Sequence, residues 1–164
     1  MLQWKIGDVT ITRVPEIEVP VPYDEKNPML ADARPEALKT MPWLYPNFVT
    51  PEGHLNLSIH ALLIDAPGLK MIVDTCVGND KPRGITLGRP LHRPFLDHLA
   101  AAGFSRESIN TVVCTHLHVD HVGWNTMLKD GKWVPTFPNA RYLIGRTEYE
   151  HWNAETSGET PAIM

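Results

Sequence analysis

The sequence has few cysteines and no long hydrophobic run. Its 164 residues include only Cys76 and Cys114, which excludes a small disulfide-stabilised scaffold. Both lie in apolar segments and are interpreted as buried thiols of a cytoplasmic protein, where thiols stay reduced. No apolar stretch approaches the roughly 20 residues that span a bilayer. Residues 1–22 lack the basic start and apolar run of a signal peptide, so no membrane is expected as a partner.

An excess of basic residues is also lacking. The formal net charge is −4, whereas nucleic-acid binding needs a basic face, so nucleic acid is not expected as a partner. Apolar residues make up 43% and charged residues 21% of the chain, the balance of a globular domain that buries a core without disulfides. No repeat, low-complexity run or clear linker divides the chain, so residues 1–164 are interpreted as belonging to one domain.

Proline is abundant and unevenly placed. Eight of the 15 prolines lie between residues 15 and 51. Because proline has no backbone donor, a central strand is not expected there, and we predict a proline-rich aromatic arm over residues 15–54. Its apolar side chains would either pin the arm to the core or line a substrate pocket. They are Met41, Trp43, Leu44, Tyr45 and Phe48.

Hydrophobic patterning predicts a mixed α/β unit. The expected strands are Val9–Val14, Leu55–Asp65, Lys70–Cys76, Thr111–Thr115, Lys132–Thr136 and Arg141–Ile144. The expected helices are Pro35–Met41, Phe95–Ala102 and Thr147–Asn153. Pro67-Gly68 predicts a type II turn between the second and third strands. The succession of strand, helix and strand over residues 70–115 predicts a parallel strand pair.

Three of the eight histidines and one aspartate fall within six residues, directly after an expected strand. The segment is His116-Leu-His118-Val-Asp120-His121. Residues two apart in an extended chain point the same way, so His116 and His118 can bind one metal ion. Once the chain turns, Asp120 and His121 can hold a second ion about 3.5–4 Å from the first. The carboxyl end of a parallel strand is also where α/β sheets place their sites.

The cluster differs from the remaining histidines. A lone histidine is usually an ordinary surface or core residue, and we interpret the others in that way. They are His54, His60, His92, His98 and His151. Burying three imidazoles and a carboxylate together is costly without a metal ion. Gly123, just after the cluster, is expected to permit a tight exit of the chain.

The motif His-x-His-x-Asp-His after an apolar strand resembles the signature of the metallo-β-lactamase-fold hydrolases. Ile72-Val-Asp-Thr75 resembles that family's upstream motif, whose aspartate, here Asp74, orients the metal-binding loop. The alternative for Asp74 is a turn-forming residue at a strand end. Residues 115–124 and 138–144 are most similar to the branch containing N-acyl-homoserine lactonases and methyl parathion hydrolase-like enzymes. The resemblance runs from Ser58 to His151.

This resemblance implies an α/β fold, the four-layer αββα sandwich, of which the chain covers the N-terminal half, with residues 55–152 as the metal-binding part. It implies a zinc-dependent hydrolase in which a hydroxide bridging two zinc ions attacks an ester-like bond. His116 and His118 would bind the first zinc. Asp120 and His121 would bind the second.

The resemblance also implies roles for residues around the metals. Asp120 would orient the hydroxide as the catalytic residue, and Asp74 would fix ligand geometry. Trp124 would either contact substrate or pack in the core. Imidazole at His118, where a diiron oxidoreductase branch has glutamate, favours zinc. The expected substrate is a lactone or carboxylic ester, with phosphotriester or β-lactamase-type hydrolysis as alternatives.

The family's site also takes two histidines and a bridging aspartate from the second half of the domain. After His121 the only histidine is His151, and no aspartate follows Asp130. We therefore expect that the chain, which stops in the polar stretch Asn153–Met164, is the N-terminal part of a longer enzyme. One alternative is a half-domain completed by a second polypeptide, for example in a homodimer. Another is an inactive or metal-binding fragment.

Overall fold

The computed structural model describes residues 1–86 and 89–155. It comprises two compact units, one formed by Met1–Glu16 with Ile59–Met164 and the other by Ile17–Ser58. Predictions that fall on residues 87–88 or 156–164, including most of the polar C-terminal stretch, lie outside the described residues. Within the described ranges, no helix has the length and apolar character needed to cross a membrane.

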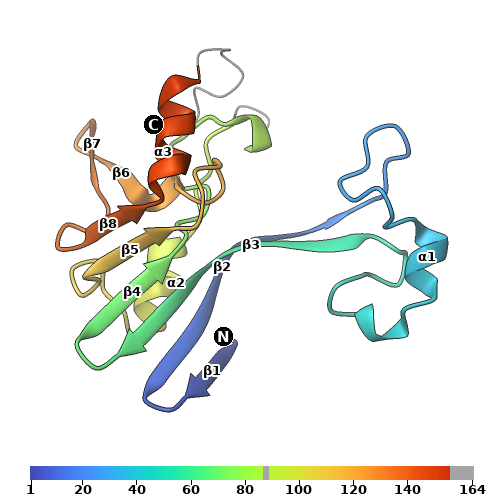
Figure 1. Ribbon diagram of the computed structural model, residues 1–164, viewed down its shortest axis with the longest axis horizontal. Helices are drawn as coiled ribbons and strands as arrows, with labels where there is room; N and C mark the ends of the chain where they lie inside the picture. Colours follow the sequence, from blue (N-terminus) through green and yellow to red (C-terminus); the bar gives the residue numbers. More distant parts are fainter. Residues whose placement is uncertain (87–88, 156–164) are drawn as a thin grey trace. The chain divides into compact units, whose positions relative to one another are not determined.

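The first unit is built on a six-stranded sheet with strand order β1-β2-β3-β4-β5-β8 (Figure 1). The strands are β1 Gln3–Ile6, β2 Val9–Val21, β3 Leu55–Ala66, β4 Leu69–Val73, β5 Thr111–Cys114 and β8 Arg141–Ile144. β3 and β4 are antiparallel, whereas β5 runs parallel to both β4 and β8. The predicted parallel pair is confirmed, and the carboxyl ends of β4, β5 and β8 share one edge of the sheet.

The β3–β4 hairpin forms as predicted, but β4 ends early. Gly68 has a φ of 76°, which the third position of a type II turn requires. β4 stops at Val73 and not at Cys76 because Asp74 and Cys76 have φ angles of 55° and 52°, outside the range of a strand.

The strand predicted over Val9–Val14 extends further than expected, into the residues assigned to the proline-rich arm. β2 runs through Pro15 and Pro20 to Val21, and an unpredicted strand, β1, precedes it. β1 pairs only with residues 9–12 of β2. Beyond that point β2 lacks a β1 neighbour, and an open strand edge is where a residue without an N–H donor is tolerated.

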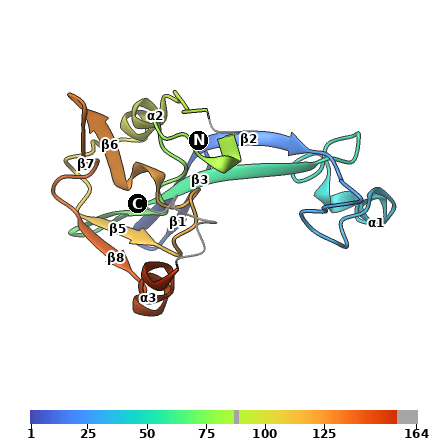
Figure 2. The ribbon, with the colours of Figure 1, turned by 90° about the horizontal axis from the view of Figure 1, so that it is seen from above.

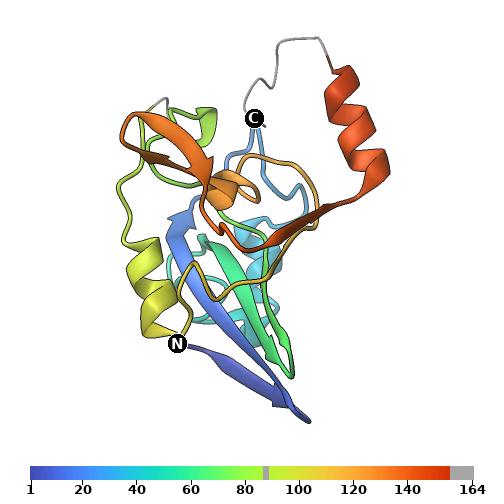
Figure 3. The same cartoon turned by 90° about the vertical axis from the view of Figure 1, so that its left-hand side faces the viewer.

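Helix α2 (Phe95–Ala101) packs on one face of the sheet, whereas α3 (Arg146–Ala154) lies on the other side, after β8 (Figures 2 and 3). Both helices were predicted. Gly103, with a φ of 85°, follows α2. A small separate sheet pairs the unpredicted β6 (Thr126–Lys129) with β7 (Lys132–Pro135).

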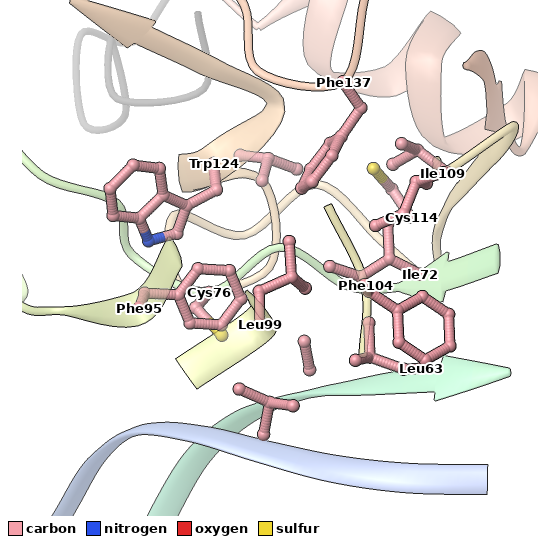
Figure 4. Packing of buried hydrophobic residues seen from close by; sticks show 14 of the residues in the cluster. Leu63, Ile72, Cys76, Phe95, Leu99, Phe104, Ile109, Cys114, Trp124 and Phe137 are labelled. Carbon is pink, nitrogen blue, oxygen red and sulfur yellow. The ribbon is translucent and has the colours of Figure 1, made fainter. Parts of the chain in front are cut away.

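Strand register divides the apolar residues of the sheet into two rows. Paired residues share a face, and consecutive residues point to opposite faces. The inner row, which faces α2, is Leu63, Ile72, Val112 and Tyr142. Its first three members are fully buried, in a cluster that includes Phe95 and Leu99 of α2 (Figure 4). The outer row is Leu62, Val73, Val113 and Leu143. Its members are half-buried or exposed.

The second unit has its own small core. It contains α1 (Pro35–Lys39) and a 3-10 turn over Pro42–Leu44. Leu38 and Val49 are buried with Ala33. Of the apolar arm residues, Met41, Leu44 and Tyr45 pack on this core. Trp43 and Phe48 are 69% and 58% exposed, with ring centroids 6.4 Å apart. A polar cavity of about 570 Å³ also lies within this unit, lined in part by Tyr23, Arg34, Glu52 and His54.

Candidate metal centre

Two loops meet at the carboxyl ends of β4 and β5. The Asp74 N–H donates to the carbonyl of Val113 at 2.8 Å, and the Thr75 N–H donates to the carbonyl of His121 at 2.7 Å. The N–H groups of Gly123 and Trp124 donate to the carbonyls of Cys76 and Thr75, respectively, both at 2.7 Å. The loop that follows β4 is thereby held, residue by residue, to the loop that follows β5.

Gly123 allows this close approach. A Cβ atom on Gly123 would lie 1.9 Å from the carbonyl carbon and oxygen of Val77 and 2.4 Å from the nitrogen of Gly78. These are backbone atoms, so no side-chain rotation can relieve the clash. Glycine is required here because two backbones cross, which is more specific than the predicted tight exit.

The three histidines of the motif lie together. The ring centroids of His116 and His121 are 3.9 Å apart, and those of His116 and His118 are 4.6 Å apart. Leu117 and Val122, between and after them, are buried. The apolar side chains therefore anchor the segment in the core while the imidazoles stay at the surface side of the loop.

Asp74 forms hydrogen bonds with two residues of the loop that follows β5. Its carboxylate accepts hydrogen bonds from the backbone N–H and the hydroxyl of Thr115, both at 2.8 Å, and lies 2.8 Å from Nδ1 of His121. Burial raises the pKa of Asp74, but the bonds from His121 and Thr115 outweigh it and hold that pKa below its ordinary value. The partners of Asp74 therefore lie 41 and 47 residues further along the chain.

His121 lies between two carboxylates. Its Nδ1 faces Asp74, and its Nε2 is 3.5 Å from Oδ2 of Asp120. Hydrogen bonding to Asp120 and then to Asp74 raises the pKa of His121 to about 9. Reciprocally, His121 lowers the pKa of Asp120. Without a metal ion, the arrangement therefore favours a protonated imidazole between two carboxylates.

Helix α3 supplies a further contact that the sequence did not reveal. Oε1 of Glu148 accepts bonds from the N–H of Leu117 and from Nε1 of Trp152, both at 2.8 Å. The Trp152 ring also lies edge-on to His118, with centroids 5.8 Å apart. The backbone between the first two histidines is thus fixed by α3. No motif signals this role, because the donor is a backbone N–H.

Trp124 is buried, with 4% of its surface exposed. Its ring stacks on Phe95 at a centroid distance of 5.5 Å (Figure 4). Its Nε1–H donates to Glu16 at 2.7 Å. Trp124 therefore packs in the core, which is one of the two alternatives expected for it. Contact of Trp124 with a substrate stays a prediction. Cys76 and Cys114 are free and buried as expected.

The donor chemistry of the cluster suits metal ions, since imidazole and carboxylate are zinc ligands. Within the described ranges, however, no three His, Cys, Asp or Glu side chains form a group that could hold an ion. The ligands expected from the motif are two per ion. The residues present therefore fit two partial sets of ligands, each of which needs further donors.

Comparison with known proteins supports the fold and the family resemblance. The model of the Metallo-beta-lactamase superfamily matches residues 56–161. N-acyl homoserine lactonase AttM from Agrobacterium fabrum is 36% identical over 56 residues, which is 34% of this chain and 18% of that protein. The structure of AidC, described as a dizinc quorum-quenching lactonase, matches with a TM-score of 0.69 and 22% identity, over 94% of this chain and 48% of AidC.

A probable metal-dependent hydrolase from Staphylococcus aureus has the same fold, with a TM-score of 0.65 and 22% identity. The match covers 93% of this chain and 52% of that one. The chain thus spans about half the length of these solved structures, and its alignment with the curated lactonase spans less than a fifth of that protein.

Proposed function

Because this chain belongs to the metallo-beta-lactamase superfamily, we propose that it forms part of a metal-dependent hydrolase whose substrates are small lactones or carboxylic esters. The observation that carries the proposal is the group of His116, His118, Asp120 and His121 at the carboxyl end of a parallel strand. The match to lactonase AttM and the likeness to AidC support the substrate class.

His116 and His118 would hold a first zinc ion, and Asp120 and His121 a second. Bound zinc supplies Lewis acidity, which polarises a carbonyl and makes water a nucleophile at neutral pH. The remaining ligands would come from the rest of a longer protein or from a second polypeptide. A covering layer of this kind would also bury the outer row of the sheet.

Asp74 would determine which nitrogen of the neutral His121 imidazole carries the proton. Since Nδ1 of His121 lies 2.8 Å from the Asp74 carboxylate, the proton of a neutral imidazole is held at Nδ1. The lone pair of Nε2 is then available for a metal ion. Asp74 also accepts two bonds from Thr115 and so holds the residue that precedes His116.

Asp120 is the candidate catalytic residue. Hydrogen bonding to His121 lowers its pKa, so its carboxylate is ionised at neutral pH. Its oxygens can then orient an attacking water or accept a proton from it.

The test measures metal binding and turnover separately. Zinc affinity of the full chain is determined by competition with a chromophoric chelator for the native sequence, His116→Ala and Asp120→Ala. We expect each variant to weaken binding at least about tenfold, because even partners outside the ligand set contribute that much. His98→Ala, at an exposed position of α2, is the matched control and should bind like the native chain.

Turnover is measured on a lactone, an aryl ester, a phosphotriester and a β-lactam with zinc-loaded protein that contains the remaining ligands, either the longer protein or this chain with its second polypeptide. The lactone or the ester should be hydrolysed fastest, with loss of that activity in both variants. Native zinc affinity in both variants would contradict the metal site. Preference for the phosphotriester or the β-lactam would contradict the substrate class.

A further inference from the structure

Glu16 is a buried carboxylate with three donors. Only 9% of its surface is exposed. Its Oε2 accepts from the Val77 N–H at 2.7 Å, and its Oε1 accepts from the Gly78 N–H at 3.2 Å and from Nε1 of Trp124 at 2.7 Å. A carboxylate in such a place is costly unless it is fully hydrogen-bonded. The position calls for a reason beyond filling the core, since an apolar side chain would fill it at lower cost.

The donors belong to both loops of the candidate metal centre. Val77 and Gly78 follow Asp74 by three and four residues, and Trp124 follows His121 by three. The two backbones touch where Gly123 lies against Val77. Glu16 therefore holds the two loops together where their backbones cross. Asp74 joins the same loops through its bonds to Thr115 and His121. Burial raises the pKa of Glu16 against the opposing hydrogen bonds.

We propose that Glu16 is a positioning residue for the metal ligands, acting through the crossing of the two loops. This inference rests on the proposed function of the site. Glu16 fixes the Trp124 indole and the Val77–Gly78 backbone. These hold the Gly123–Trp124 segment, and that segment sets where His121 stands relative to Asp74. Loss of the carboxylate frees the crossing without removing any ligand.

Glutamine cannot replace Glu16 in this role. The carboxylate offers an acceptor oxygen to each side, whereas an amide offers one oxygen and turns an NH₂ group towards an N–H donor. Glu16→Gln keeps the size of the side chain and leaves at least one donor unpaired. Trp124→Phe is the complementary change, because it removes the Nε1 donor with part of the indole and keeps a ring to stack on Phe95.

The control separates positioning from general stability. Val14 lies two residues before Glu16 on β2, on the same face, and is fully buried in the same core. Val14→Ala is expected to lower the free energy of unfolding while it leaves the loops bonded. Zinc affinity by chelator competition and the visible absorption spectrum of the Co²⁺-substituted chain are measured for all variants.

We expect Glu16→Gln to weaken zinc binding about tenfold, as loss of a partner outside the ligand set does, and to change the Co²⁺ spectrum. Trp124→Phe should weaken binding in the same direction, and the double variant should bind no worse than Glu16→Gln. Val14→Ala should keep the native affinity and spectrum.

Native zinc affinity in Glu16→Gln, or a loss no larger than in Val14→Ala, would overturn the role of Glu16. If Glu16→Gln does not fold, Trp124→Phe decides, and its native affinity would overturn the proposal. A failure of His116→Ala to weaken binding would refute the metal site itself. The two failures are therefore distinguishable.

Discussion

The two faces of the six-stranded sheet differ sharply, although both are apolar. On the inner face, Leu63 and Ile72 are buried under α2 and the loops that carry the histidines. On the outer face, their neighbours Leu62 and Val73 are only partly buried, and Leu143 is 45% exposed. Antiparallel sheets with one solvated face usually alternate apolar and polar residues. This sheet does not, so its sequence is suited to a layer on each side.

Gly123→Ala is expected to have the largest effect on the inner side. Its new Cβ would overlap the Val77 backbone, so the loops must separate, and the free energy of unfolding should fall by more than about 4 kcal/mol. Gly84→Ala, where a Cβ meets no atom within 4 Å, is the control and should unfold like the native chain in urea. A loss below about 1 kcal/mol in Gly123→Ala would contradict the crossing.

Leu63→Ala and Leu62→Ala compare the faces directly on one strand. Removing the buried Leu63 side chain should cost about 3 kcal/mol, whereas removing the partly buried Leu62 side chain should cost less than about 1 kcal/mol. Urea unfolding of each variant, measured at several protein concentrations, gives both losses of unfolding free energy. Equal losses would contradict the difference between the faces and would indicate that another surface covers the outer row in solution.

The titration of Lys81 is expected to have a smaller effect on the free energy of unfolding. Its Nζ donates to the carbonyl of Thr126 at 2.8 Å and lies 4.1 Å from the Trp133 ring centroid. Burial, with repulsion from Arg83, lowers the pKa of Lys81 to about 8. Between that pH and the ordinary value of about 10.5, the unfolded chain holds more protons than the folded chain, so stability rises with pH.

Relative to Lys81→Met, the native chain should therefore gain about 2 kcal/mol between pH 7.5 and pH 10. Urea unfolding of both proteins at the two pH values measures this gain. A difference between the proteins that stays constant with pH would show that Lys81 titrates alike in both states.

Local patterns predicted the parts of the molecule whose causes are local. The Pro67-Gly68 turn, α2 and the motif from His116 to His121 depend on neighbouring residues, and the parallel β4–β5 pair follows from their order. Glu16 and Glu148 could not be found in this way. Glu16 meets its partners 61 and 108 residues further along the chain, and two of its donors are backbone N–H groups that carry no signature.

The extent of β2 was also hidden in the sequence. Its prolines argue against a strand, and only the short reach of β1 explains why they are tolerated. The early end of β4 depends on left-handed residues that are not glycine, Asp74 and Cys76. Sequence alone gives little warning of that conformation, because tertiary bonds hold it.

The contacts that hold the histidine segment also determine when it becomes ordered during folding. Asp74 and His121 are 47 residues apart, and Leu117 and Glu148 are 31 apart. Such distant contacts form only after long loops have closed, which slows folding. A chain emerging from the ribosome would therefore complete α3 before the segment of His116 and His118 is fixed. Zinc present earlier would meet a segment whose contacts have not yet formed, so we expect the loop to become ordered late in folding.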